Sequence, residues 1–172
     1  SSPMGTQSHG YESQNAFLLS VAGDPIFLRS GRRDLYGSPH HKRWMWETKS
    51  VNSILVNGRG QETRSSRRLG EITRFKTSPT FDFVVGEAAS AYRGQLSRFS
   101  RAIRFLKPGG IVIFDVLEAK KPATFQWRWH APYEMKIEAR TVVARGKRAT
   151  ATLRILHPGD LELTQTNRFD PP

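Results

Sequence analysis

Short stretches with a two-residue hydrophobic period, separated by glycine and proline, dominate this chain. The clearest are 71–76 (EITRFK), 81–88 (FDFVVGEA), 97–106 (SRFSRAIRFL) and 111–119 (IVIFDVLEA). The stretch 123–130 (ATFQWRWH) alternates strictly and places Phe125, Trp127 and Trp129 on one face. Because helical periodicity is scarce, the chain is predicted to be all-β, an antiparallel β-sandwich of many short strands.

Turn residues define the remaining strands. A turn at Gly23 to Pro25 joins predicted strands 15–22 and 26–29 into a hairpin, with Phe17 and Leu19 on the core face of the first strand. The other predicted strands are 52–57, 134–144, 147–156 and 161–166. The longest non-strand piece is 30–51, and a loop of that length is usually functional or packs on a neighbour.

The length and composition favour one domain over residues 1–172. The 172 residues are 37% hydrophobic, enough for a real core, and no repeat or linker is visible. The chain opens without an initiating Met, so we expect a domain truncated at both ends. No stretch approaches the roughly 20 apolar residues of a membrane span, and the lack of cysteine excludes disulfides.

The charge of the chain predicts an anionic partner. The chain has 27 Lys and Arg residues against 15 Asp and Glu, which gives a formal charge of +12. Acidic polysaccharide, nucleic acid and anionic lipid are therefore all candidate partners. The loop 30–51 gathers cationic and aromatic side chains suited to anionic chains, namely Arg32, Arg33, Tyr36, His40, His41 and Trp44. In the alternative interpretation the tryptophans cap the fold and the charges are solvated. The second basic run, 64–68, reads as a solvated hairpin tip.

Nucleotide, zinc-protease and serine-hydrolase motifs are missing from the sequence. Nucleic acid is the weakest partner, because the aromatic residues alternate into a core and form no exposed stacking row. Adjacent His40 and His41 point in opposite directions on an extended chain and cannot easily bind one metal ion. The pair is therefore only weak evidence for a zinc site. Without the family resemblance, the candidate catalytic residues are His9, Tyr11, Glu12, Tyr36 and His130. Of these, His130 is expected to be a structural residue.

Two long stretches, SHGYESQNAFLL…GDPIFLRSGRRDLYGSPHHKRW…TKSVNSILVNGRGQ and FLKPGGIVIFDVLEAKKPATFQWRWHAP, resemble the β-sandwich domain of the heparinase II/III-like polysaccharide lyases. The similarity runs from about residue 1 to about residue 135. It implies a bacterial protein of the periplasm, cell envelope or exterior, with a helical toroid domain N-terminal to the sandwich. It also implies β-elimination at a uronic acid in an acidic polysaccharide, such as a glycosaminoglycan, although the sequence does not distinguish heparan-, alginate- and ulvan-like substrates.

The resemblance also assigns site residues. His9 matches the first histidine of the family motif, approximately H-x-H-x-D-x-x-S-F, which faces the active site. With Tyr11 and Tyr36 it forms the predicted catalytic group. The predicted substrate-binding residues are Gln14, Asn15, Arg32, Arg33, His40, His41, Trp44 and Asn52. Gln14 and Asn15 are also expected to satisfy backbone groups at the entry to the first strand.

The chain departs from the family at its zinc ligands. Tyr11, Arg29 and Val51 stand where the ligands belong, and none of them is a competent zinc ligand, so we expect no metal cofactor. Ser13 replaces the aspartate of the motif, and Glu12 is a candidate counter-charge for Arg29. Two interpretations remain: a metal-free lyase, or a degenerate sandwich that only binds acidic glycan. In either case the 172 residues alone are expected to be inactive, because a lyase cleft needs groups from both domains.

Overall fold

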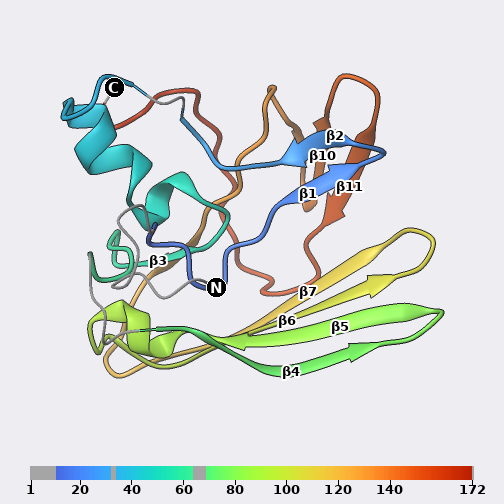
Figure 1. The fold of residues 1–172 in the computed structure, drawn as a ribbon, viewed down its shortest axis with the longest axis horizontal. Helices are drawn as coiled ribbons and strands as arrows, with labels where there is room; N and C mark the ends of the chain where they lie inside the picture. The colour runs from blue at the N-terminus through green and yellow to red at the C-terminus, as the bar shows by residue number, and fades with distance from the viewer. Residues whose placement is uncertain (1–10, 32–33, 64–68, 172) are drawn as a thin grey trace. The chain divides into compact units, whose positions relative to one another are not determined.

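The computed structural model describes residues 11–31, 34–63 and 69–171. In these ranges the chain consists of antiparallel sheets with three short helical turns (Figure 1), so the prediction of an all-β chain, consistent with a β-sandwich, is confirmed. Two compact units are present, Ser1–Ala16 with Ser53–Trp127 and Phe17–Asn52 with Arg128–Pro172. The basic run 64–68 lies outside the described residues.

The first unit contains a four-stranded sheet in the order β4-β5-β6-β7 (Figure 1). Its strands are β4 (Glu71–Thr77), β5 (Phe81–Glu87), β6 (Leu96–Leu106) and β7 (Ile111–Ala119). Each agrees with its predicted range to within one residue at either end, because the two-residue period and the turns mark these strands clearly. A short ladder pairs β3 (Ile54–Val56) with β8 (Phe125–Trp127), and a 3-10 turn, η3, spans Ala89–Tyr92.

The core of the first unit lies against one end of this sheet. Ile54, Val56, Tyr92 and Phe99 are fully buried, and the Tyr92 and Phe99 rings pack edge to face with centroids 5.7 Å apart. Aromatic pairs of this geometry add to the free energy of burial. This packing holds η3 and β3 on the sheet.

The second unit begins with a hairpin of β1 (Leu19–Val21) and β2 (Asp24–Phe27). The hairpin was predicted, but its turn lies at Ala22–Gly23 and not at Gly23 to Pro25. Both Ala22 and Gly23 have positive φ, which matches the twist of a two-residue hairpin turn.

A three-stranded sheet in the order β11-β10-β9 completes the second unit. Its strands are β9 (Lys136–Glu138), β10 (Thr141–Arg145) and β11 (Thr150–Arg154). The predicted strand 134–144 is therefore wrong as one strand, because Ala139 has a φ of 49° and turns the chain between β9 and β10. The predicted strand 161–166 is also wrong, since that segment pairs with no strand of the described chain.

The core of the second unit forms around Ile26, Phe27 and Ala144. The indole of Trp129 packs edge to face on Phe17 at 4.8 Å and on Phe27 at 4.9 Å between ring centroids. Phe17 and Leu19 both pack against this cluster, as the alternating pattern predicted.

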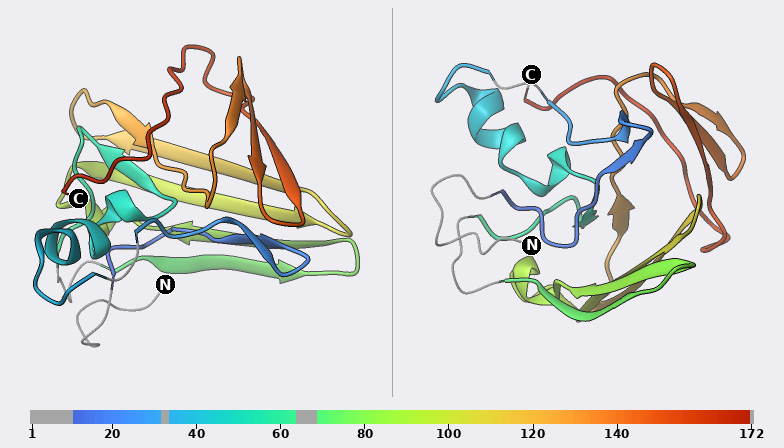
Figure 2. Two further views of the ribbon diagram at one scale, coloured as in Figure 1. Left: turned by 90° about the horizontal axis from the view of Figure 1, so that it is seen from above. Right: turned by 45° about the vertical axis from the view of Figure 1, so that its right-hand side comes forward.

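The long non-strand segment 30–51 folds into two helical turns, η1 (His41–Met45, a π-turn) and η2 (Thr48–Ser50). Figure 2 shows the C-terminal segment returning to these turns, where the Pro171 carbonyl lies 3.2 Å from Nδ1 of His40. In the described part of the chain, no helix has the length and apolar character that a membrane crossing needs.

Candidate functional site

In the first unit the segment 11–16 is held by hydrogen bonds of its backbone and amide groups. The Gln14 backbone N–H donates to Oε1 of Gln61, and Nε2 of Gln61 donates to the Gln14 carbonyl, both at 2.9 Å. Oε1 of Gln14 accepts a hydrogen bond from the Gly70 backbone N–H at 3.2 Å. Gln14 is only 3% exposed, so its amide serves the scaffold, and this burial argues against the predicted contact with substrate.

Asn15 binds across the sheet in the same way. Its Nδ2 donates to the carbonyls of Gly86 at 2.9 Å and Phe99 at 3.2 Å. A Cβ on Gly86 would clash with Oδ1 of Asn15, so glycine at this position of β5 lets the amide reach the sheet. The φ of Asn15 is 55°, which ends extended geometry and explains why β1 starts four residues later than predicted.

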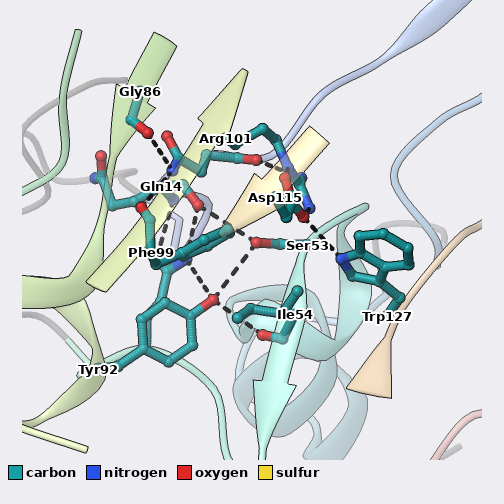
Figure 3. Close-up of polar contacts among 11 residues, drawn as sticks. Gln14, Ser53, Ile54, Gly86, Tyr92, Phe99, Arg101, Asp115 and Trp127 are labelled. Atoms are coloured by element: carbon teal, nitrogen blue, oxygen red, sulfur yellow. Dashed lines mark hydrogen bonds and ion pairs between the residues drawn. The ribbon is translucent and has the colours of Figure 1, made fainter. Parts of the chain in front are cut away.

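A buried ion pair between β6 and β7 supports this segment. Arg101 binds Asp115 through two hydrogen bonds, Nε to Oδ1 at 2.8 Å and Nη2 to Oδ2 at 2.6 Å (Figure 3). The two side chains are 3% and 1% exposed. Nη1 of Arg101 donates to the Asn15 carbonyl at 2.6 Å, and Nε1 of Trp127 donates to Oδ2 of Asp115 at 2.8 Å. The pair therefore fixes the backbone of the segment that leads from Tyr11 into the core.

The Tyr92 hydroxyl also belongs to this hydrogen-bond network. Its hydroxyl donates to the Ile54 carbonyl at 2.9 Å and accepts from Nε2 of Gln61 at 3.3 Å. Burial raises the pKa of Tyr92, so the phenol stays protonated at neutral pH and acts as a fixed hydrogen-bonding group.

The predicted catalytic residues are placed only in part. His9 lies outside the described residues, while Tyr11 is half-buried at the start of the segment that the network holds. Tyr36 belongs to the second unit, is 87% exposed, and its ring centroid lies 4.8 Å from that of His41. The catalytic assignment of these three residues stays a prediction.

The basic and aromatic loop of the second unit packs against its own chain. His40 and Trp44 are 5% and 3% exposed and stack at 6.3 Å between ring centroids. Phe169 packs edge to face on both rings at 5.1 Å, and Nζ of Lys49 lies 5.6 Å from the Trp44 ring centroid. The rings of His40 and Trp44 are therefore occupied by protein neighbours, which favours the capping interpretation for these two residues.

His41 is also integrated into the loop. The Gly37 backbone N–H and Nε1 of Trp46 approach its Nδ1 and Nε2 at 3.2 and 3.3 Å. Arg32 and Arg33, the other predicted anion-binding residues of the loop, lie outside the described residues. Lys42 and Arg43 are the exposed cations of η1.

A glycine allows the close packing of this loop. Gly31 has a φ of 89°, and a Cβ there would lie 2.9 Å from the Trp44 ring and 3.1 Å from Nε2 of His40. Any side chain at position 31 would meet both rings as well as backbone strain.

Asn52 and His130 act as structural partners in the second unit. Asn52 is 1% exposed, its Nδ2 donates to the Phe17 carbonyl at 2.9 Å, and its Oδ1 accepts from the His130 backbone N–H at 2.8 Å. Burial, together with the charge of Arg128, lowers the pKa of His130 to about 4. The imidazole is therefore neutral at neutral pH, and the Asn52 amide has its bonds within the protein rather than free for substrate.

Two of the three residues that the sequence resemblance places at zinc-ligand positions, Arg29 and Val51, lie in the second unit. Nη2 of Arg29 donates to the Met45 carbonyl, and Val51 is 5% exposed. In residues 11–31, 34–63 and 69–171, no three His, Cys, Asp or Glu side chains gather as a metal site would require. The proposed pairing of Glu12 with Arg29 stays a prediction, since the two belong to different units.

Comparison with protein families decides the affiliation. The model of the family described as "Heparinase II/III-like, C-terminal" matches residues 1–170. The chain belongs to the heparinase II/III-like family. Its match is to the C-terminal domain of that family, as the sequence predicted. None of the curated proteins matches the chain.

Sequence reasoning missed the buried pair of this heparinase II/III-like domain. Within β6, Arg101 shares the face of Phe99 and Ile103, and within β7, Asp115 shares the face of Ile113 and Leu117. The sequence signal for such a pair is two opposite charges at inward-facing, otherwise apolar positions of neighbouring predicted strands. A single buried charge without a partner would be very costly in free energy.

Proposed function

We propose that the chain is the β-domain of a lyase that cleaves a uronate-containing acidic polysaccharide by β-elimination. The match of residues 1–170 to the C-terminal heparinase II/III-like model is the observation that supports it. The net charge of +12 suits a polyanionic substrate. A polymeric substrate of this kind fits a protein of the cell envelope or exterior, and we include that location in the proposal.

The chemistry needs three functions around the uronate. Its carboxylate must be neutralised, a base must remove the proton at C5, and an acid must protonate the glycosidic oxygen as the C4–O bond breaks. The products are an unsaturated uronate and a new chain end. We assign proton transfer to His9 with the phenols of Tyr11 and Tyr36, since imidazole and phenol are suitable acid and base groups.

The assay for this function is the ultraviolet absorbance of the unsaturated uronate. We expect the protein with its helical toroid domain to produce it from at least one of heparan sulfate, alginate or ulvan, and the 172 residues alone to produce none at a useful rate, because both walls of the cleft supply catalytic groups. Binding of all three polymers without unsaturated product by the complete protein would contradict the proposal.

A non-catalytic glycan-binding domain is the second candidate. The observation that favours it is the replacement of the family's zinc ligands by Tyr11, Arg29 and Val51. The two candidates separate in the same assay, since a binding domain retains the polymer and leaves its absorbance unchanged.

We further propose that the domain functions without a metal cofactor. The purified protein is expected to carry no stoichiometric zinc, and chelators are expected to leave its thermal unfolding unchanged, because a phenol, a guanidinium and an isopropyl group replace the ligands. Elemental analysis that finds about one zinc per chain would show this expectation to be wrong.

A further inference from the structure

One face of the β4–β7 sheet carries cations interleaved with aromatic rings. The ladder registers align Lys76, Phe83, Arg104 and Val112 in one row across the four strands, and Arg74, Val85, Ala102 and Phe114 in the next row. Directly paired residues of antiparallel strands share a face. We call the six residues Arg74, Lys76, Phe81, Phe83, Arg104 and Phe114 the cationic face.

The cationic face is the opposite side of the sheet from the buried Arg101–Asp115 pair, because side chains alternate along β6 and β7. Phe114 is 63% exposed, and its neighbour Val112 is 49% exposed. Exposed apolar side chains that adjoin one another are a common mark of a binding surface.

The cations of this face are held beside its aromatic rings. The Arg104 guanidinium carbon lies 4.3 Å from the Phe81 ring centroid, and Nζ of Lys76 lies 5.6 Å from it. Neither these two side chains nor Arg74 forms an ion pair with a described residue. The Asp82 carboxylate is on the other face, where it binds Thr77 and Lys107. The two rows therefore present three positive charges and no carboxylate, and the carboxylates of Glu71 and Glu87 lie in the next row of this face, beyond Arg74 and Val85.

We propose that the cationic face is a second, non-catalytic binding surface for an acidic polysaccharide. Arg74, Lys76 and Arg104 would meet carboxylate or sulfate groups, and the apolar faces of sugar rings would lie on Phe83 and Phe114. Cations on β4 and β6 are two strands apart, roughly 10 Å, a distance that suits successive charges on a polymer better than one small anion. The inference rests on the proposed function, which supplies the polymer, but it concerns residues outside the predicted catalytic group.

The test measures binding of heparin and polygalacturonate to the purified protein by calorimetry, with neutral dextran as the blank polymer. Replacing Arg74, Lys76 and Arg104 by Gln together is expected to weaken binding by about tenfold or more and to reduce its salt dependence. The matched control replaces Arg93, Lys120 and Lys121, three exposed cations of the same unit outside the sheet rows, by Gln. It removes the same charge and is expected to retain most of the affinity.

A second variant separates the rings from the charges. Phe114→Ser leaves the net charge unchanged and, because the ring is mostly exposed, is expected to leave thermal unfolding unchanged while weakening binding severalfold. Equal losses in the two triple variants, or unchanged binding by both the Arg74/Lys76/Arg104 and Phe114 variants, would overturn the inference. So would tighter binding of a DNA oligonucleotide than of heparin through the same residues.

Lyase turnover is recorded separately for each variant. One possible result is that the wild-type protein gives no unsaturated product and the Arg74/Lys76/Arg104 variant loses heparin binding. This result contradicts the proposed lyase and supports the proposed binding surface. A protein that gives product, while the same variant binds like wild type, contradicts the surface alone.

Discussion

Asp115→Ala is expected to lower the free energy of unfolding by about 3 to 5 kcal/mol. The substitution leaves the Arg101 guanidinium buried, with its side chain 3% exposed, and removes both of its hydrogen bonds to the carboxylate. It also removes the acceptor of the Trp127 indole N–H. Because a buried charge without a counter-charge is far costlier than a neutral group, this change should exceed the usual effect of a single substitution.

The same two strands provide the matched control. Arg98 and Glu118 form a second pair between β6 and β7 at 3.6 Å, but their side chains are 49% and 56% exposed. Glu118→Ala is expected to change stability by less than about 1 kcal/mol, because water screens exposed pairs. Urea unfolding of both variants measures the difference. Similar losses of unfolding free energy for Asp115→Ala and Glu118→Ala would show that burial does not increase the contribution of the Arg101–Asp115 pair to stability.

If the full-length protein is the lyase we propose, His9→Ala is expected to reduce its turnover by on the order of 10²-fold or more with little change in folding. The sequence resemblance predicts that His9 is the cleft-facing histidine of the family motif, and a neutral imidazole accepts a proton near neutral pH. The measurement is the rate of unsaturated uronate formation together with the thermal unfolding of each variant.

Phe17→Ala is the control for effects that arise from stability alone. Phe17 is half-buried against the Trp129 indole, so its loss is expected to cost roughly 3 kcal/mol of unfolding free energy, while folded molecules keep their turnover. If His9→Ala keeps near-normal turnover, or loses it only together with folding, the histidine is a structural group and the catalytic assignment fails.

The candidate site was predictable only where local sequence specifies a role. The motif around His9 gave a site assignment that stays a prediction, whereas the packing of Phe17 into the core followed from the apolar pattern. The bonds of Gln14 and Asn15 to Gln61, Gly86 and Phe99 join residues 47 to 84 positions apart, so no local pattern encodes them. For the same reason the sequence did not show that His40 and Trp44 are covered by Phe169.

The sequence by itself determined the all-β class, the four long strands of the first unit, the excess of positive charge and the family. These depend on alternation, turn residues and composition, which act over a few neighbouring positions. Only the tertiary structure decided which polar residues are buried. Strand register brings Arg101 opposite Asp115 and places Arg104 on the other face, because a shift of one residue reverses the side of every side chain. The separation of a buried charge pair from an exposed cationic face is therefore a property of the folded sheet.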